Sequence, residues 1–236
     1  AAGNIIADIA HKDGSLKASK RGSLKTALQS APETALQSAP ETALQIINEI
    51  RNDAHALHAS VNHAYDRIRP YGFHLDMVVN WVRKYIEEVC VSEQDVLPIY
   101  FAAFYHDSIE DARLSYNDVM RIAKELMNEE QAYLATEIVY ALTNEKGRNR
   151  AERANEKYFA GIREIPYAPF VKLADRLANT SYAFSKGTAD SLRMSKVYRE
   201  ELPGFLEALK VVGTDVRFSL PEAMVEDLWY VIPQVG

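Results

Sequence analysis

The sequence has 236 residues, of which 47% are hydrophobic and 25% are charged, enough for a sizeable core in one or two domains. Its 33 acidic and 27 basic residues leave a formal net charge of −6, which argues against a protein that binds duplex DNA through a basic surface. A single cysteine excludes an internal disulfide, and no apolar run approaches the roughly 18 residues of a membrane span. Residues 1–4 show no signal-peptide pattern, so we expect a cytoplasmic protein without a membrane partner.

The N-terminal segment is repetitive. An eight-residue unit, TALQSAPE, occupies residues 26–33 and 34–41 and begins again at Thr42. Each unit has only one leucine, which is too little apolar surface to bury a face, and its proline would interrupt a continuous helix. We interpret residues 1–45 as a low-complexity tail without catalytic content, the alternative being an arm that binds a partner.

Helical patterning follows this segment. Apolar residues recur every three or four positions, the period of an amphipathic helix, and no run alternates as a strand would. Pro70 ends the first helix, and Ser115 with Asp118 has the spacing of a capping box that opens the fourth. The fold class is therefore predicted to be all-α. The expected helices cover residues 46–64, 73–89, 96–111, 115–127, 130–142, 151–162, 167–184 and 190–209.

These helices define the expected domain organisation. Residues 46–210 are predicted to form one folded domain of about eight helices. Gly213 and Pro221 interrupt the pattern after it. Residues 211–236 are therefore expected to form a short helix and a surface tail.

The most informative segment is the end of the apolar third helix, where four ionisable residues lie close together. His106 and Asp107 are adjacent, and Glu110 and Asp111 come one helical turn later. A buried helix end does not carry such groups unless they have partners, and a divalent metal ion is one such partner. The simpler alternative is an ordinary solvated helix end.

Two other segments carry residues of the same chemistry. His74 follows Pro70 and Tyr71 at the start of the second helix, and Asp175 lies in the middle of the apolar seventh helix, one turn before Asn179. Two imidazoles and two carboxylates suit a borderline metal such as Mn²⁺ or Fe²⁺, with positions open for water and substrate. Such a site forms only if the three segments meet in the fold.

The motifs are Pro-Tyr-x-x-His at 70–74, His-Asp-x-x-Glu-Asp at 106–111 and Lys-Leu-Ala-Asp-Arg-Leu-x-Asn at 172–179. In this order they resemble the HD-domain metal-dependent phosphohydrolases. More narrowly, they are similar to the (p)ppGpp hydrolases, over roughly residues 50–205. No segment resembles the synthetase domain of the bifunctional alarmone enzymes, so the resemblance implies a stand-alone hydrolase with the HD-domain helical bundle.

The resemblance also implies roles for the matching residues. The implied metal is Mn²⁺ or another divalent ion such as Fe²⁺ or Mg²⁺, and its implied ligands are His74, His106, Asp107 and Asp175. Glu110 and Asp111 match an acidic pair that positions and activates the attacking water. The resemblance and the distribution of basic residues together give the candidate substrate-binding residues: Arg67, Arg69, Lys146, Lys172, Asn179 and Tyr198.

The implied reaction is the release of pyrophosphate from the 3′ position of (p)ppGpp, a small nucleotide that a net-acidic protein can bind through a local basic cluster. Leu75 and Ala112 stand where the family usually has Pro and Thr, which leaves room for an HD phosphohydrolase that acts on dNTPs or nucleoside monophosphates. A non-catalytic helical domain that binds a nucleotide or a protein is a further alternative. The metal's identity and the oligomeric state are not predicted by the sequence.

Overall fold

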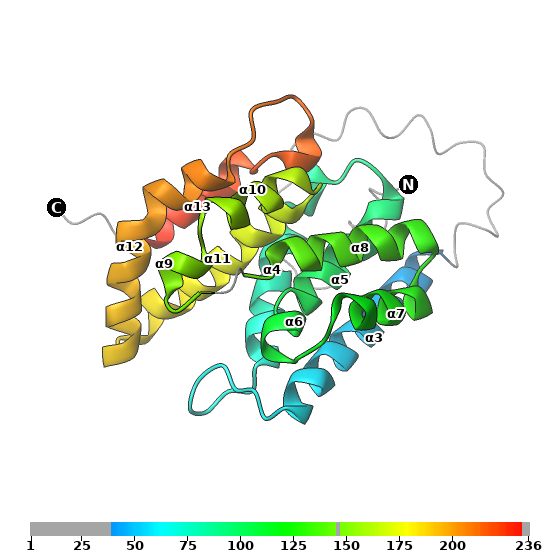
Figure 1. Cartoon of the computed structure of the whole chain (residues 1–236), viewed down its shortest axis with the longest axis horizontal. Helices are drawn as coiled ribbons and strands as arrows, with labels where there is room; N and C mark the ends of the chain where they lie inside the picture. The colour runs from blue at the N-terminus through cyan, green and yellow to red at the C-terminus, as the bar shows by residue number, and fades with distance from the viewer. Residues whose placement is uncertain (1–38, 145–146, 233–236) are drawn as a thin grey trace.

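The computed structural model describes residues 39–144 and 147–232, so most of the predicted tail, and Lys146, lie outside the described residues. The all-α prediction is confirmed: the described ranges contain no strand, only an isolated bridge between Ala64 and Pro70. None of their helices is long and apolar enough to cross a membrane. The helices in Figure 1 are α3 (Ala39–Ser60), α4 (Gly72–Val89), α5 (Val96–Tyr105), α6 (Ser108–Asp111), α7 (Tyr116–Leu126), α8 (Glu129–Leu142), α9 (Arg150–Arg153), α10 (Glu156–Glu164), α11 (Ala168–Lys186), α12 (Ala189–Leu209) and α13 (Glu222–Val231), with 3₁₀ turns at Glu93–Asp95 and Val216–Phe218.

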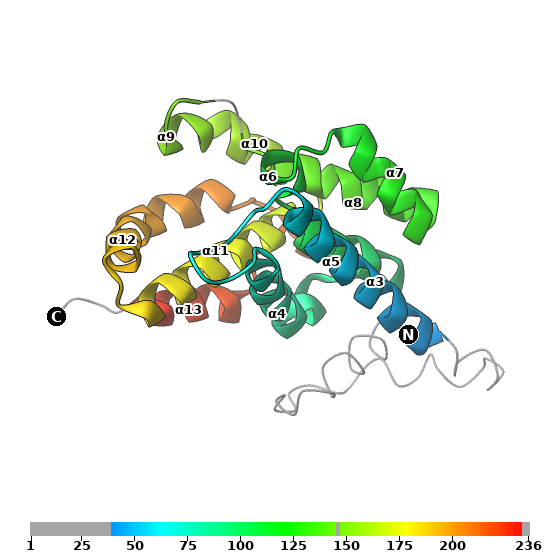
Figure 2. The same ribbon diagram turned by 90° about the horizontal axis from the view of Figure 1, so that it is seen from below.

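Helix α5 forms the centre of the core. Nine of its ten residues are buried, since its sequence is apolar on every side. Helices α3, α4 and α8 pack around it, and α11 packs against α4, α12 and α13 (Figures 1 and 2). This packing brings the C-terminal end of α5, the first turn of α4 and the middle of α11 close together.

The predicted start of α7 is confirmed in its hydrogen bonds. The Ser115 hydroxyl accepts from the Asp118 backbone N–H at 3.2 Å, and the Asp118 carboxylate accepts from the Ser115 N–H at 2.9 Å. Asn128 and Gln131 form a second capping box at the start of α8. Two helices therefore begin where side chains satisfy otherwise unpaired backbone N–H groups.

The single helix predicted over residues 96–111 is wrong, because the chain forms α5 and the one-turn α6 instead. The backbone leaves the α-helical path at Asp107, where φ is −101° and ψ is 4°. The Tyr71 hydroxyl donates a hydrogen bond to the Asp107 carboxylate at this point. His106, which is buried, and Asp107 lie at this break between α5 and α6.

The helix predicted over residues 151–162 is also divided, into α9 and α10. Asn155 caps α10 by accepting a hydrogen bond from the Tyr158 N–H at 3.0 Å, and Asn149 caps α9 in the same way through the Glu152 N–H at 2.9 Å. Asparagine side chains compete with the helical backbone for hydrogen bonds, so each asparagine starts a new helix.

The folded domain extends past both predicted boundaries at 46 and 210. Helix α3 already begins at Ala39, with Pro40 in its first turn, where the missing N–H of proline costs no hydrogen bond. At the other end, Met224 and Leu228 of α13 are fully buried in the core. Their four-residue spacing places them on the one face of α13 that packs against α11. The segment 211–232 is therefore part of the domain.

Replacing Leu228 by alanine tests whether α13 contributes to the core. We expect the free energy of unfolding to fall by about 2–5 kcal/mol, because the change removes a fully buried side chain and leaves a cavity. The matched control is Tyr230→Ala on the exposed side of α13, with an expected change of about 0.5 kcal/mol or less. Urea unfolding measures both, and equal small losses would contradict the buried position of Leu228.

Candidate metal centre

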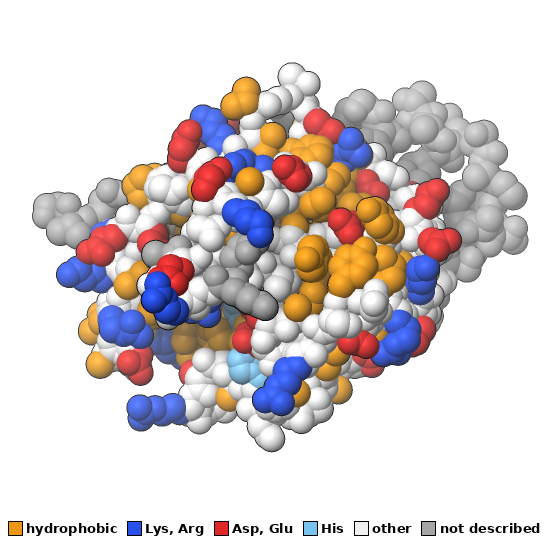
Figure 3. Space-filling model, in the orientation of Figure 1, with side chains coloured by type: hydrophobic (Ala, Val, Ile, Leu, Met, Phe, Trp, Pro, Cys, Tyr) orange, Lys and Arg blue, Asp and Glu red, His pale blue; other side chains and the backbone are white. Residues whose placement is uncertain are grey.

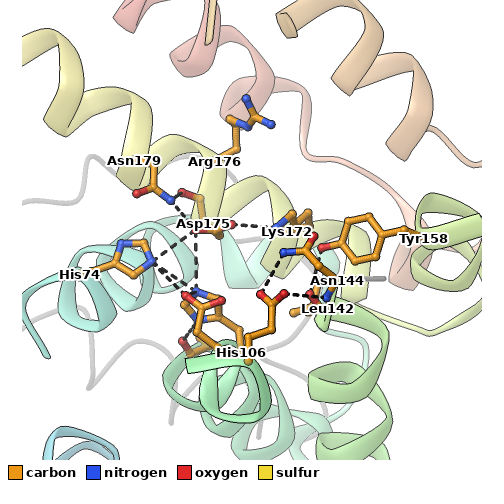
Figure 4. Close-up of polar contacts among 12 residues, drawn as sticks. His74, His106, Leu142, Asn144, Tyr158, Lys172, Asp175, Arg176 and Asn179 are labelled. Atoms are coloured by element: carbon orange, nitrogen blue, oxygen red, sulfur yellow. Dashed lines mark hydrogen bonds and ion pairs between the residues drawn. The ribbon is translucent and has the colours of Figure 1, made fainter. Parts of the chain in front are cut away.

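Four residues from the three predicted segments lie side by side in the fold, and Figure 4 labels three of them, His74, His106 and Asp175. His74 lies in the first turn of α4, His106 and Asp107 lie in the break between α5 and α6, and Asp175 lies in the middle of α11. The condition for a metal site, that these distant segments meet, is thus fulfilled by the packing of α4 and α11 around the end of α5.

The donor atoms of these residues face one another. The Nε2 atoms of His74 and His106 are 3.3 Å apart. Asp107 Oδ2 lies 2.9 Å from His106 Nε2 and 3.8 Å from His74 Nε2, and Asp175 Oδ1 lies 3.8 Å and 3.3 Å from the same two nitrogens. Neighbouring ligands on one cation, each about 2.1 Å from it, are about 3 Å apart. His74, His106 and Asp107 can therefore hold a metal ion, and Asp175 lies within reach of it.

The burial of both imidazoles and the hydrogen bond of His106 fit such a group, whereas His74 Nδ1 is buried without a hydrogen-bond partner. Only 1% of the His74 side chain and 2% of the His106 side chain are exposed. His106 Nδ1 donates to the Ala103 carbonyl oxygen at 2.9 Å, an arrangement typical of metal-ligating histidines, and this leaves the Nε2 lone pair facing the carboxylates. Lone pairs and carboxylates that face each other need a proton or a cation between them. Two imidazoles with carboxylates suit a divalent transition metal.

The four groups shift one another's pKa values. Burial lowers the pKa of His106, but the Asp107 and Asp175 carboxylates outweigh this effect and raise the pKa to about 9. Burial raises the pKa of both aspartates, yet His106 beside Asp107 and Lys172 beside Asp175 hold these two pKa values below the usual range. A proton on His106 therefore balances the carboxylates when no metal is bound.

Metal affinity is expected to depend on pH for this reason. A metal ligand must be the neutral imidazole, so binding below the His106 pKa of about 9 displaces its proton. Affinity for Mn²⁺ should rise about tenfold per pH unit between about pH 7 and pH 9 and then level off. Calorimetric titration in buffers of different ionisation enthalpy measures both the affinity and the protons released. An affinity that is constant over this range, with no proton released, would contradict the assignment of His106.

A second layer of residues orients the carboxylates. Lys172 Nζ lies 3.0 Å from Asp175 Oδ2, and Asn179 Nδ2 donates to Asp175 Oδ1 at 2.7 Å. The Tyr65 hydroxyl in turn donates to Asn179 Oδ1 at 3.0 Å. Asp175 therefore has its side chain fixed by partners on its own helix and by the loop before α4. Hydrogen-bond partners of this kind set the direction of a metal ligand.

The acidic pair of α6 lies next to this centre. Both Glu110 oxygens accept hydrogen bonds from Asn144, from its backbone N–H at 3.2 Å and from Nδ2 at 2.9 Å. Asp111 Oδ2 lies 3.8 Å from His63 Nε2. Burial, and then the charge of Asp107, raise the pKa of both Glu110 and Asp111. A carboxylate with a raised pKa is a better proton acceptor near neutral pH.

A cavity of about 170 Å³ opens over the two aspartates. Asp107 and Asp175 line it together with the predicted residues Lys172, Asn179 and Tyr198. Lys172 is largely buried, with 17% of its side chain exposed, and the neighbouring Tyr158 and Asp175 raise its pKa although burial lowers it. The cavity thus joins the candidate metal centre to a fixed positive charge.

Two predicted substrate residues do not line this cavity. Arg69 Nη1 pairs with Asp66 Oδ2 at 2.8 Å and donates to the Tyr182 hydroxyl at 3.0 Å, and Arg67 is exposed in the loop before α4. The Asp66 carboxylate also accepts hydrogen bonds from the Ile68 and Arg69 N–H groups, so the loop folds back on itself. The prediction for Lys146 lies outside the described residues.

Three cations that are not among the predicted substrate-binding residues line the cavity: Arg150, Arg153 and Arg176. Arg176 directly follows Asp175 in its motif, and Arg150 and Arg153 belong to the basic stretch after α8. These basic residues were therefore visible in the sequence, but in the stretch after α8 they alternate with acidic residues, a pattern typical of a solvated helix. Only the tertiary fold brings the arginines of that stretch to the same cavity as the aspartates.

Comparison of the chain with protein families, with curated proteins and with solved structures finds no match.

Proposed function

We propose that this protein is a metal-dependent phosphohydrolase that removes pyrophosphate from the 3′ position of (p)ppGpp. The observation that carries the proposal is the position of the four candidate ligands. Their donor atoms face one another, and two of the four, Asp107 and Asp175, line a cavity whose wall also carries four cations: Lys172, Arg150, Arg153 and Arg176. A metal centre beside a cluster of cations suits the hydrolysis of a compound with several phosphates.

The ligands and their neighbours have separate tasks in this proposal. His74, His106, Asp107 and Asp175 would hold the metal ion. Bound there, a divalent ion lowers the pKa of water and polarises a phosphoryl oxygen. Lys172, which contacts Asp175 at 3.0 Å, fixes that carboxylate and presents its charge to the cavity.

Glu110 and Asp111 are the proposed proton acceptors. Their raised pKa values favour taking a proton from water near neutral pH. Two hydrogen bonds from Asn144 hold the Glu110 carboxylate in place. Asn144 itself lines the cavity, so Glu110 lies next to the cavity wall. Asp111, which is more exposed, lies beside His63 and can pass a proton on to solvent.

The arginines of the cavity wall are proposed to bind phosphate. Arg153 lies on α9 and Arg176 on α11, one residue after a candidate ligand. A guanidinium group can donate two parallel hydrogen bonds to two oxygens of one phosphate, and several such groups suit a pyrophosphate. The resemblance of the three motifs to the (p)ppGpp hydrolases is the reason for naming this particular substrate.

Incubation with Mn²⁺ and one substrate at a time tests the proposal. Pyrophosphate released from ppGpp, with GDP as the second product, is the expected result. Release of triphosphate from dNTPs, or of inorganic phosphate from nucleoside monophosphates, with ppGpp left intact, would show that the protein is a phosphohydrolase with a different substrate. No hydrolysis of any of these compounds by metal-loaded protein would overturn the proposed function.

A further inference from the structure

A second cavity adjoins the one over the aspartates. It has a volume of about 460 Å³ and is lined by residues of α9, α10, α11 and α12, and by Ala154 between α9 and α10. Phe159 and Phe205 form its aromatic part, with ring centroids 6.2 Å apart and the rings nearly perpendicular. The space-filling view shows a hollow with hydrophobic and His side chains in it and Lys and Arg side chains near its rim (Figure 3). The cavity is therefore large enough for a flat ring system and has aromatic walls.

The two cavities share one wall. Arg150, Ala154, Phe159 and Arg176 line both of them. The Arg176 guanidinium lies over the Phe205 ring, 4.2 Å from its centroid. A ligand can thus have its anionic part among the cations on the metal side and its flat apolar part on the other side of the same arginines.

The arginines at this wall are fixed in place. Arg150 makes two hydrogen bonds to Glu201, at 2.7 and 2.9 Å, and Arg176 donates to the same carboxylate at 2.7 Å. Only 11% of the Arg176 side chain is exposed. Glu200 and Glu201 balance these two arginines in the second cavity. In the metal-side cavity, four cations face only Asp107 and Asp175, so the excess of positive charge that favours phosphate lies on that side.

Gly204 marks open space on the α12 side of this cavity. A Cβ atom built on Gly204 would meet nothing within 4 Å, although the residue lies inside a helix and next to the buried Phe205. Gly204 is exposed and lines the cavity, so a larger side chain there meets no clash and can extend across the cavity opening, away from the groups that surround the candidate metal centre.

We propose that this second cavity binds the aromatic base of a nucleotide whose phosphates lie in the metal-side cavity. The inference rests on the proposed function, since it names where the rest of the substrate lies. Flat bases stack on aromatic and guanidinium faces, and such contacts are tolerant of base type. The base then lies on the α12 side of the centre, away from the loop that carries Arg67 and Arg69.

Binding measurements with two probes test this assignment. GDP carries a base and a diphosphate, whereas pyrophosphate carries the charge alone. With the metal-free whole chain, so that no hydrolysis occurs, calorimetry should show that Gly204→Phe weakens GDP binding by at least about tenfold, the contribution of one stacked base. Binding of pyrophosphate should change less than about twofold, because its site is on the other side of the arginines.

Leu192→Phe, at an exposed position of α12 that lines neither cavity, is the matched control and should leave the affinities for both probes unchanged. Phe159→Leu is a second variant and should also weaken GDP more than pyrophosphate. Equal losses for the two probes, or unchanged GDP binding in Gly204→Phe, would overturn the assignment. Failure of the proposed function appears separately, as absence of hydrolysis by the metal-loaded protein.

Discussion

Asp107→Asn is expected to lose hydrolysis of phosphate substrates and to bind Mn²⁺ more than about 100-fold less tightly. Even the hydrogen-bond partners of a metal ligand are worth about 10–100-fold in affinity, so the loss of a ligand charge should exceed that range. Asparagine keeps the size of the side chain and an oxygen that can accept the Tyr71 hydrogen bond. The fold should therefore persist, and the loss should be specific to the metal centre.

Calorimetry for the metal and a product assay for hydrolysis measure this effect. Asp53→Asn, at an exposed position of α3, is the matched control and should match the unmodified chain in both assays. Full activity of Asp107→Asn would show that Asp107 is not a ligand of the metal ion. Loss of activity with unchanged metal affinity would also contradict the account, because it would assign Asp107 to another task.

Lys172→Met is expected to separate stability from metal binding. Lys172 and Asp175 are both largely buried, with 17% and 13% of their side chains exposed, and breaking such a pair leaves an uncompensated carboxylate. The metal-free variant should lose about 3 kcal/mol of unfolding free energy. Added Mn²⁺ should restore much of this loss, because a cation then takes over the neutralisation of Asp175. Hydrolysis should fall by about 100-fold even with metal bound, since a positive charge is missing from the cavity.

Urea unfolding with and without Mn²⁺ measures the stability, and a product assay measures the activity. Lys84→Met is the matched control: its partner Asp227 is more exposed, so the loss should be about 1 kcal/mol or less and independent of Mn²⁺. Two results would count against the account: equal losses for the two lysines, or a metal-loaded Lys172→Met variant with full activity.

The residues that could hold a metal ion were easier to predict from the sequence than the residues that line the cavity. His106 and Asp107 at the end of an apolar run, and Asp175 inside another, are ionisable groups where burial is costly, and such groups stand out in a sequence. The packing of α4 and α11 around α5 then brings them together. The break at Asp107 was not predicted, because a helix period continues across it and the hydrogen bond from Tyr71 comes from a distant segment.

The substrate side could not be predicted in the same way. Arg150 and Arg176 are 26 residues apart and meet only because both contact Glu201 of α12. Arg69, which looked suited to a ligand, is paired with Asp66 three residues earlier. Surface cations recur throughout the chain, and their partners depend on tertiary packing rather than on local pattern.

The most direct test of the account is pulsed electron paramagnetic resonance of the protein loaded with one equivalent of Mn²⁺. We expect nuclear modulation from two imidazole nitrogens, those of His74 and His106, whose Nε2 atoms lie 3.3 Å apart. His106→Gln should reduce the modulation to that of a single imidazole. Bound Mn²⁺ without nitrogen modulation, or a spectrum that His106→Gln leaves unchanged, would contradict the proposed metal centre and the hydrolysis that depends on it.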